Sequence, residues 1–221
     1  MRLVGDIALD AEVRAIASGA ITDGEPVIVN STGTVSGVTD ALTEAIGTAV
    51  VYNSGATNYN RATFDSNSNR VVVAYKDDGN SLYGTAIVGA ISGTSISYGT
   101  EVVFESATTT YTSIAFDSNS NRVVIAYTDG GNSEYGTAIV GTVDPSDNSI
   151  SFGTPVLFNG SARAVFMSCT FDSSNNKVVI TYQDSGNSSY GTAIVGTVDS
   201  SDNSISFGTK AVFHSVSSAL Q

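Results

Sequence analysis

The sequence predicts an all-β protein made of tandem four-stranded antiparallel units. Three observations lead to this class. Val, Ile, Thr, Tyr and Phe, which favour strands, recur in short runs that Asn, Asp, Ser and Gly separate. The chain contains three copies of one pattern, and each copy holds four such runs. A period near 50 residues with four strands matches the size of a β-propeller blade, so the copies are expected to be propeller-like blades.

The repeat is visible when the chain is aligned with itself. The copies read FDSNSNRVVVAYKDDGNSLYGTAIVGAI from Phe64, FDSNSNRVVIAYTDGGNSEYGTAIVGTV from Phe116 and FDSSNNKVVITYQDSGNSSYGTAIVGTV from Phe171, at periods of 52 and 55 residues. The extra residues of the longer period fall in connections, where insertions are tolerated. We therefore expect residues 46–221 to form the repeat domain and residues 1–45 a small N-terminal β module.

The middle copy illustrates the four predicted strands. Its strand two has an almost continuous apolar core, Val123 to Tyr127, which predicts an interior strand covered on both faces. Turns rich in Asp, Asn, Ser and Gly separate the strands, and Pro145 lies in the last turn. The expected strands one to four are Tyr111 to Phe116, Arg122 to Thr128, Tyr135 to Val143 and Ser149 to Phe158.

The repeat extends beyond three copies at both ends. IGTAVVYNSGATNYNRATFD, from Ile46, aligns with YGTEVVFESATTTYTSIAFD, from Tyr98, so an extra copy of strand four is expected to begin at residue 46. In this alignment Tyr52 corresponds to Phe104. At the other end, the register of Tyr59 and Tyr111 falls on Leu220, where a new strand one would begin.

Three blades are too few for a ring, because propellers close with about four to eight. Residues 11–45, with strand-like GEPVIVN and GTVSGVT, could supply a degenerate fourth blade. Alternatively, two or more chains could join through their exposed edges into a homo-oligomer. The third arrangement is an open stack. The first two are favoured equally over the third.

Charge and composition exclude several classes of function. The formal net charge of −12, from 9 basic and 21 acidic residues, leaves no positive stripe for a phosphate backbone, so nucleic acid is not an expected partner. The single cysteine, Cys169, excludes an intrachain disulfide framework and is expected in the core. Acidic residues interrupt the N-terminal stretch, and no run is long enough to span a membrane, so the chain is expected to be soluble and made in the cytoplasm.

The turn after strand one has the spacing of a calcium loop. Oxygen ligands alternate along it in the first two copies, as they do in calcium-binding loops. The third copy, Asp172-Ser-Ser-Asn-Asn, departs from this spacing, and no acidic residue ends the loop. The alternative is a hairpin turn in which Asp and Asn bond their own backbone. The candidate ligands are Asp65, Asn67, Asn69, Asp117, Asn119 and Asn121.

The turn after strand two repeats an Asp, an Asn and a Tyr in every copy. A carboxylate and an amide could bond sugar hydroxyls while the ring stacks on a pyranose face, so this set is a candidate glycan site. Because the set does not vary between copies, maintenance of the fold explains it equally well. The residues are Asp77, Asn80 and Tyr83, then Asp129, Asn132 and Tyr135, then Asp184, Asn187 and Tyr190.

Few residues suit catalysis. His214 is the only histidine and lies near the C-terminus, which argues against Ser-His-Asp and Cys-His arrangements. Paired carboxylates could converge from the Asp-rich turns, but no copy shows an obvious deviation toward an acid pair. Arg163 and Met167 break the pattern of the third copy and are not acidic. No enzymatic activity is expected.

The repeat FDSNSNRVVIAYTDGGNSEYGTAIVGTV followed by SISFGTPVLF resembles tandem repeats in virion-associated proteins of tailed bacteriophages. ASGAITDGEPVIVNSTGTVSGV, residues 17–38, resembles small β modules near the ends of phage decoration and fibre proteins. The resemblance implies that residues 1–45 attach to the particle, unless they form the degenerate blade, and that the repeats face outward for display, adhesion or capsid reinforcement.

These observations predict a non-enzymatic structural protein on the virion surface, a capsid decoration or tail-fibre protein made in the host cytoplasm. Its expected partners are other virion proteins and further copies of itself, without nucleic acid or membrane, and with calcium as the only candidate cofactor. The alternative function is a lectin-like propeller that binds cell-surface glycans. A polysaccharide depolymerase is the least favoured.

Overall fold

The structure, a computed structural model, describes residues 16–24, 26–37 and 46–215. It divides into two compact units, residues 1–46 (the N-terminal unit) and residues 47–221 (the repeat array). Every regular element in the described ranges is a strand, and nearly all pairing is antiparallel, which confirms the all-β class. No helix capable of crossing a membrane occurs among these residues.

The N-terminal unit contains a short antiparallel hairpin of β1 (Val27–Val29) and β2 (Val35–Gly37), so both segments that looked strand-like do form strands. Asn30 organises the turn between them. Its backbone N–H donates to the Thr34 carbonyl at 2.8 Å, and its side-chain amide donates to the Ser18 and Thr34 hydroxyls at 3.3 and 3.1 Å. Gly33 takes a φ of +80°, a conformation that glycine adopts without strain.

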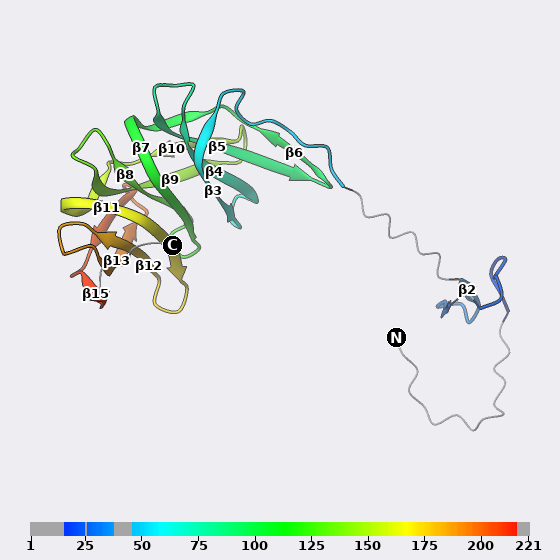
Figure 1. Cartoon of the computed structure of the whole chain (residues 1–221). Coiled ribbons are helices and arrows are strands. Elements are labelled where there is room, and N and C mark those ends of the chain that lie inside the picture. The colour runs from blue at the N-terminus through cyan, green and yellow to red at the C-terminus, as the bar shows by residue number, and fades with distance from the viewer. Residues whose placement is uncertain (1–15, 25, 38–45, 216–221) are drawn as a thin grey trace. The chain divides into compact units, whose positions relative to one another are not determined.

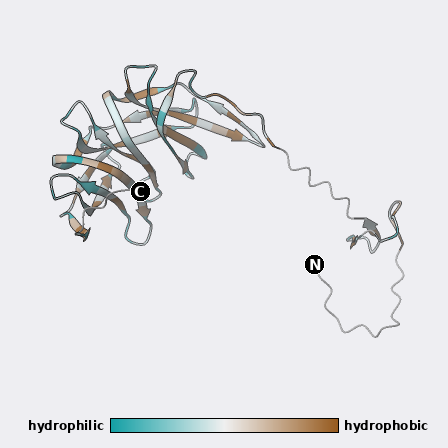
Figure 2. Cartoon of the chain, viewed as in Figure 1, coloured by the Kyte–Doolittle hydropathy of each residue, from teal (hydrophilic) through white to brown (hydrophobic). Residues whose placement is uncertain are grey.

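The repeat array is one hydrogen-bonded sheet path with three side branches (Figure 1). The path runs β14-β13-β12-β11-β9-β8-β7-β5-β4-β3, with β6, β10 and β15 paired beside it, and it does not close among the described residues. In Figure 2 hydrophobic residues lie mainly on these strands. The strands are β3 (Thr57–Asp65), β4 (Arg70–Asp77), β5 (Tyr83–Ser92), β6 (Ser95–Tyr98), β7 (Val102–Asp117), β8 (Arg122–Asp129), β9 (Tyr135–Asp144), β10 (Ser149–Phe152), β11 (Val156–Asp172), β12 (Lys177–Asp184), β13 (Tyr190–Asp199), β14 (Ser204–Phe207) and β15 (Ala211–His214).

The predicted interior strand of the middle copy is confirmed as β8. Val124 and Ala126 belong to a core shared with the third copy, whereas Val123, Ile125 and Tyr127 belong to a core shared with the first. Successive side chains of a strand point to opposite faces, so one nearly continuous apolar run serves both cores. The hydrophobic cores therefore lie between successive copies.

The prediction for strand four is wrong in one respect. The expected single strand, Ser149 to Phe158, is β10 followed by a break at residues 153–155, and the chain then continues as β11 through the next strand one. Pro155 cannot donate a ladder hydrogen bond, and a Cβ on Gly153 would lie 2.1 Å from the Asn203 carbonyl oxygen. The first half of β11 pairs with β9 and the second half with β12, so one long strand joins adjacent copies.

The expected extra strand four at residue 46 is not a strand, since residues 46–56 are irregular. The predicted equivalence with the later copies nevertheless holds in the packing. The Tyr52 ring lies 5.2 Å from Tyr75 and 5.9 Å from Tyr98, just as Phe104 lies 5.2 Å from Tyr127 and 5.9 Å from Phe152. In the later copies, by contrast, strands β7 and β11 begin by pairing with strand three of the preceding copy.

The C-terminal end of the array is left partly uncovered. β15 pairs with β13 in the way that the start of β11 pairs with β9. Its Phe213 is 64% exposed, whereas the equivalent Phe158 is 4% exposed because the third copy covers it. Leu220, where a new strand one was expected, lies outside the described residues.

An arginine fastens each copy to the turn of the next one. Arg122 donates from Nε to Asn203 Oδ1 at 2.5 Å and from Nη2 to the Ser200 carbonyl at 2.7 Å. Arg70 makes the same pair of bonds, at 2.5 and 2.7 Å, to Asn148 Oδ1 and the Pro145 carbonyl. We call this pair of bonds the arginine clamp. It ties together segments more than 70 residues apart in the chain.

Candidate functional site

The Asp residues of the predicted glycan set are turn caps. Asp77 Oδ1 accepts the backbone N–H of Gly79 at 2.9 Å and that of Asn80 at 3.1 Å. Asp129 Oδ1 accepts from Gly131 at 2.9 Å, and Asp184 does the same in its own copy. All three Asp residues are buried. The interpretation as fold maintenance therefore accounts for their lack of variation, since each organises its own turn.

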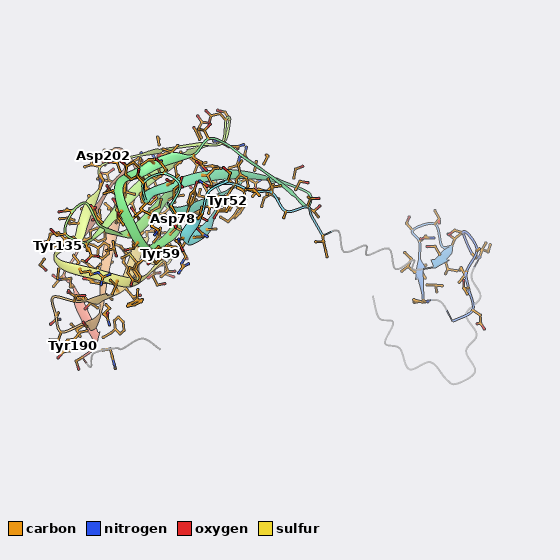
Figure 3. All side chains as sticks on the ribbon, turned by 45° about the horizontal axis from the view of Figure 1, so that its top comes forward. Tyr52, Tyr59, Asp78, Tyr135, Tyr190 and Asp202 are labelled. Carbon is orange, nitrogen blue, oxygen red and sulfur yellow. The ribbon has the colours of Figure 1, made fainter. Side chains whose placement is uncertain are left out.

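The Asn and Tyr residues of the same set line the turns one copy at a time. The Asn80, Asn132 and Asn187 carbonyls accept the N–H of Tyr83, Tyr135 and Tyr190 at 3.0, 3.0 and 2.9 Å. The Asn side chains are exposed and the Tyr side chains half-buried. In Figure 3 the labelled Tyr135 and Tyr190 lie at separate places along the array. The three turns thus present three separate small surfaces.

The predicted calcium ligands also act as turn residues. Asp65 Oδ1 accepts the N–H of Asn67 at 2.9 Å and of Ser68 at 3.0 Å, and Asp117 Oδ1 accepts those of Asn119 and Ser120 at 2.9 and 3.0 Å. Asn69 and Asn121 both have a φ of 55°, the left-handed geometry that Asn tolerates. In the described part of the chain, no three His, Cys, Asp or Glu residues are placed to hold a metal ion. The arrangement fits a hydrogen-bonded turn.

A second polar cluster, which the sequence reasoning missed, lies beside the buried Asp of each copy. In the third copy Lys210 Nζ lies 3.1 Å from Asp184 Oδ2 and donates to Asn159 Oδ1 at 2.8 Å. Asn159 in turn donates to Asp184 Oδ1 at 3.1 Å. In the first copy, the Asn53 amide donates to both Asp77 Oδ2 and Glu101 Oε1, at 3.0 and 2.9 Å.

The middle copy departs from this arrangement because Glu105 stands where the others have Asn. Tyr127 donates its hydroxyl to Glu105 Oε2 at 3.1 Å. Burial raises the pKa of the Glu105 carboxyl, and the nearby Asp129 carboxylate raises it further. Aligning Asn53, Glu105 and Asn159 in the repeat would have revealed this deviation. The middle copy therefore brings the Glu105 and Asp129 carboxylates together. It also lacks the lysine of the third copy, because Pro155 occupies the position of Lys210.

A third candidate surface is a row of aromatic rings, one from each copy. It consists of Tyr59, Tyr111 and Phe166, and we call it the aromatic ladder. The ring centroids of Tyr59 and Tyr111 are 5.3 Å apart, and those of Tyr111 and Phe166 are 4.8 Å apart. Each residue sits where the strand register shifts in β3, β7 or β11. A bulge of this kind redirects a side chain, and bulges are frequent beside functional sites.

The ladder residues adopt left-handed backbone geometry, with φ values of 54°, 50° and 53°. For a bulky side chain this costs about 1–3 kcal/mol per residue. A hollow of about 410 Å³ lies against the ladder, lined by Tyr59, Arg61, Tyr111, Thr112, Phe166 and Met167. The sequence analysis used Tyr59 and Tyr111 only to set the register, although an aromatic residue at this position in every copy was a usable signal.

Basic side chains accompany the ladder. Arg163, which broke the repeat pattern, lies over the Tyr111 ring at 5.8 Å and pairs with Glu134 at 3.2 Å. Lys76 lies 5.7 Å from the centre of the Tyr59 ring and 3.0 Å from Asp78 Oδ1, and Figure 3 shows Tyr59 and Asp78 close together. Cations over aromatic faces stabilise ring orientation.

The remaining candidates have structural positions. His214 is the last residue of β15, paired with Gly191, and lines a hollow of about 170 Å³ together with Phe166 and Phe213. Cys169 is half-buried in β11 beside the core of the second and third copies, where loss of hydration raises the pKa of its thiol to about 12. Met167 is buried in the same core.

No model of a known protein family matches this sequence, and no curated protein matches it.

Proposed function

We propose that the chain is a non-enzymatic structural component of a tailed-phage virion, a decoration or fibre protein that displays the repeat array outward. The observation that carries this proposal is the use made of the repeated polar residues. The Asp residues present in every copy organise turns, and Arg70 and Arg122 fasten copies together. A protein whose repeated polar side chains organise turns and join neighbouring copies suits the role of a rigid spacer.

We further propose that the three copies are propeller-like blades and that the N-terminal unit attaches the array to the particle. Shared cores on both faces of β8 support stacking of blades. The exposed Phe213 and the outer edges of the sheet, which have no strand partner among the described residues, support association between chains, so the protein acts as a homo-oligomer on the virion surface.

The decisive experiment is purification of intact particles followed by detection of the protein and its localisation by antibody labelling in electron micrographs. We expect stoichiometric association and labelling at one structural location, together with an oligomeric mass at micromolar concentration. A protein absent from washed particles would refute the virion role. Deleting residues 1–45 should abolish attachment while the array still unfolds cooperatively. Loss of folding would instead support the degenerate blade.

A second candidate function, glycan binding, is favoured by a specific observation, the aromatic ladder with its adjoining hollow. The residues proposed for this function are therefore the ladder rings rather than the Asp, Asn and Tyr of the turns.

A further inference from the structure

The residues of the aromatic ladder have a left-handed backbone conformation, which elsewhere in the array is mostly adopted by Asn and Ser. Apart from the three ladder residues, left-handed non-glycine positions hold Asn or Ser, with Leu82 and Glu134 as the exceptions. Asn or Gly would form the same bulge with less strain. Rings at all three positions therefore need a compensating interaction. The tilted and edge-to-face contacts within the ladder supply only part of it, since Phe166 is 48% exposed.

Arg61 adds a positive charge to the hollow beside the ladder. It follows the first bulge in β3, lines the hollow, and its guanidinium donates to the Asn60 carbonyl at 2.8 Å. Lys76 and Arg163 are paired with Asp78 and Glu134. No ion pair to Arg61 is found in the described ranges, so this guanidinium remains available to an anionic group.

We propose that the aromatic ladder and Arg61 form a binding site for an acidic oligosaccharide, one that carries a hexuronate residue. The apolar face of a pyranose would pack on the exposed ring of Phe166, and Arg61 would bind the sugar carboxylate through two parallel N–H bonds. Thr112 also lines the hollow, and its buried hydroxyl has no hydrogen-bond partner among the described residues. This proposal does not depend on the virion role.

The single available cation limits the charge that the ligand can carry. The chain carries a formal charge of −12, so a nucleic acid with one phosphate at every nucleotide is repelled along its whole length, and so is a polymer with a carboxylate on every sugar. An oligosaccharide with one hexuronate among neutral sugars carries a single carboxylate, which Arg61 can pair with. Successive ring contacts at about 5 Å along the ladder suit an extended chain that crosses from copy to copy.

Titration calorimetry of the full-length protein with xylotriose that carries one glucuronate branch (the acidic probe), and with xylotriose alone (the neutral probe), tests the proposal. We expect the acidic probe to bind with a dissociation constant below about 1 mM and at least about tenfold more tightly than the neutral probe. The variant Arg61→Gln should weaken binding of the acidic probe about tenfold or more and leave the neutral probe unaffected. Among the described residues the Arg61 guanidinium donates a hydrogen bond to the neighbouring Asn60 carbonyl and to no other group, so this variant should retain the fold, which thermal unfolding verifies.

The variant Phe166→Ala should weaken both probes, because it removes the exposed ring. Lys177→Gln, a change of equal charge on β12 away from the hollow, is the matched control and should bind like the parent protein. Equal affinity for the two probes, undetectable binding of the acidic probe at about 1 mM, or unchanged binding by Arg61→Gln would each overturn the proposal. Particle association is measured separately, so failure here leaves the virion role standing.

Discussion

Removing one arginine clamp should weaken the junction between two copies. In Arg122→Ala, the Nε bond to Asn203 and the Nη2 bond to the Ser200 carbonyl are both lost. Hydrogen bonds that involve a charged group contribute about 1.5–3 kcal/mol each when shielded, and partial exposure of Arg122 reduces this. We expect the free energy of unfolding to fall by about 2–3 kcal/mol in total, without a change of sheet topology.

Urea denaturation monitored by circular dichroism measures this loss. Arg70→Ala should behave like Arg122→Ala, because it breaks the equivalent bonds to the preceding junction. Lys177 is the matched control. It occupies the same repeat position in the third copy and pairs with Asp172 through the strand backbone, while its side chain has no hydrogen bond or ion pair among the described residues. Lys177→Ala should change stability by less than about 0.5 kcal/mol.

A double-mutant cycle isolates the clamp. Arg122→Ala and Asn203→Ala remove opposite ends of one 2.5 Å bond, so their combined cost should be smaller than the sum of the single costs by about 1 kcal/mol. Strictly additive costs, or a Lys177→Ala cost equal to that of Arg122→Ala, would refute the reasoning that the arginine fastens adjacent copies.

Three further predictions follow from burial and charge. Phe158→Ala should destabilise the fold by about 3–5 kcal/mol, because the Phe158 ring is 4% exposed and its centroid lies 5.1 Å from that of Tyr182. Phe213, the equivalent residue in the third copy, is 64% exposed, so Phe213→Ala should cost less than about 1 kcal/mol. Equal losses in denaturant midpoint would contradict the conclusion that Phe213 lacks the cover that Phe158 has. Glu105→Gln should stabilise the protein at pH 7 by a few tenths to about 1 kcal/mol, since Gln retains an acceptor for Tyr127 without the charge. Because the pKa of Glu105 is raised in the folded protein, the ionised carboxyl destabilises the fold once the pH rises above the ordinary carboxyl range. The extra stability of Glu105→Gln should therefore disappear in acid, where both side chains are neutral. Extra stability that persists in acid would disprove an electrostatic origin. Cys169, whose thiol pKa is raised to about 12, should react with a disulfide reagent at pH 8 at least about 100-fold more slowly in the native protein than in urea, and comparable rates would show that the thiol is not shielded.

Local pattern was sufficient for much of the fold. The apolar run of β8 identified an interior strand, and the Asp, Asn and Gly turns marked where strands end. The alignment of Tyr52 with Phe104 correctly paired two rings that pack in the same way, although only the second lies in a strand. Such features depend on residues close together in the chain, so they can be predicted without knowing which strand will pack against them.

The candidate site was less accessible to sequence reasoning. The repeated Asp residues suggested a ligand, but only hydrogen-bond geometry shows that the Asp77 carboxylate accepts its own turn amides. The ladder escaped notice because its rings are 52 and 55 residues apart and meet only when adjacent copies stack. Left-handed geometry at Tyr111 likewise depends on the register shift between β7 and β8.

The sequence by itself determined the all-β class, the three copies, the interior strand and the turns, because each of these depends on short-range periodicity and turn chemistry. Only the tertiary structure decided that strand four divides, that β7 and β11 bridge neighbouring copies, and which polar residues remain free. The physical reason is that hydrogen-bond partners and ring contacts are set by segments more than 50 residues apart, and a linear pattern does not specify which of several equivalent strands will be the neighbour.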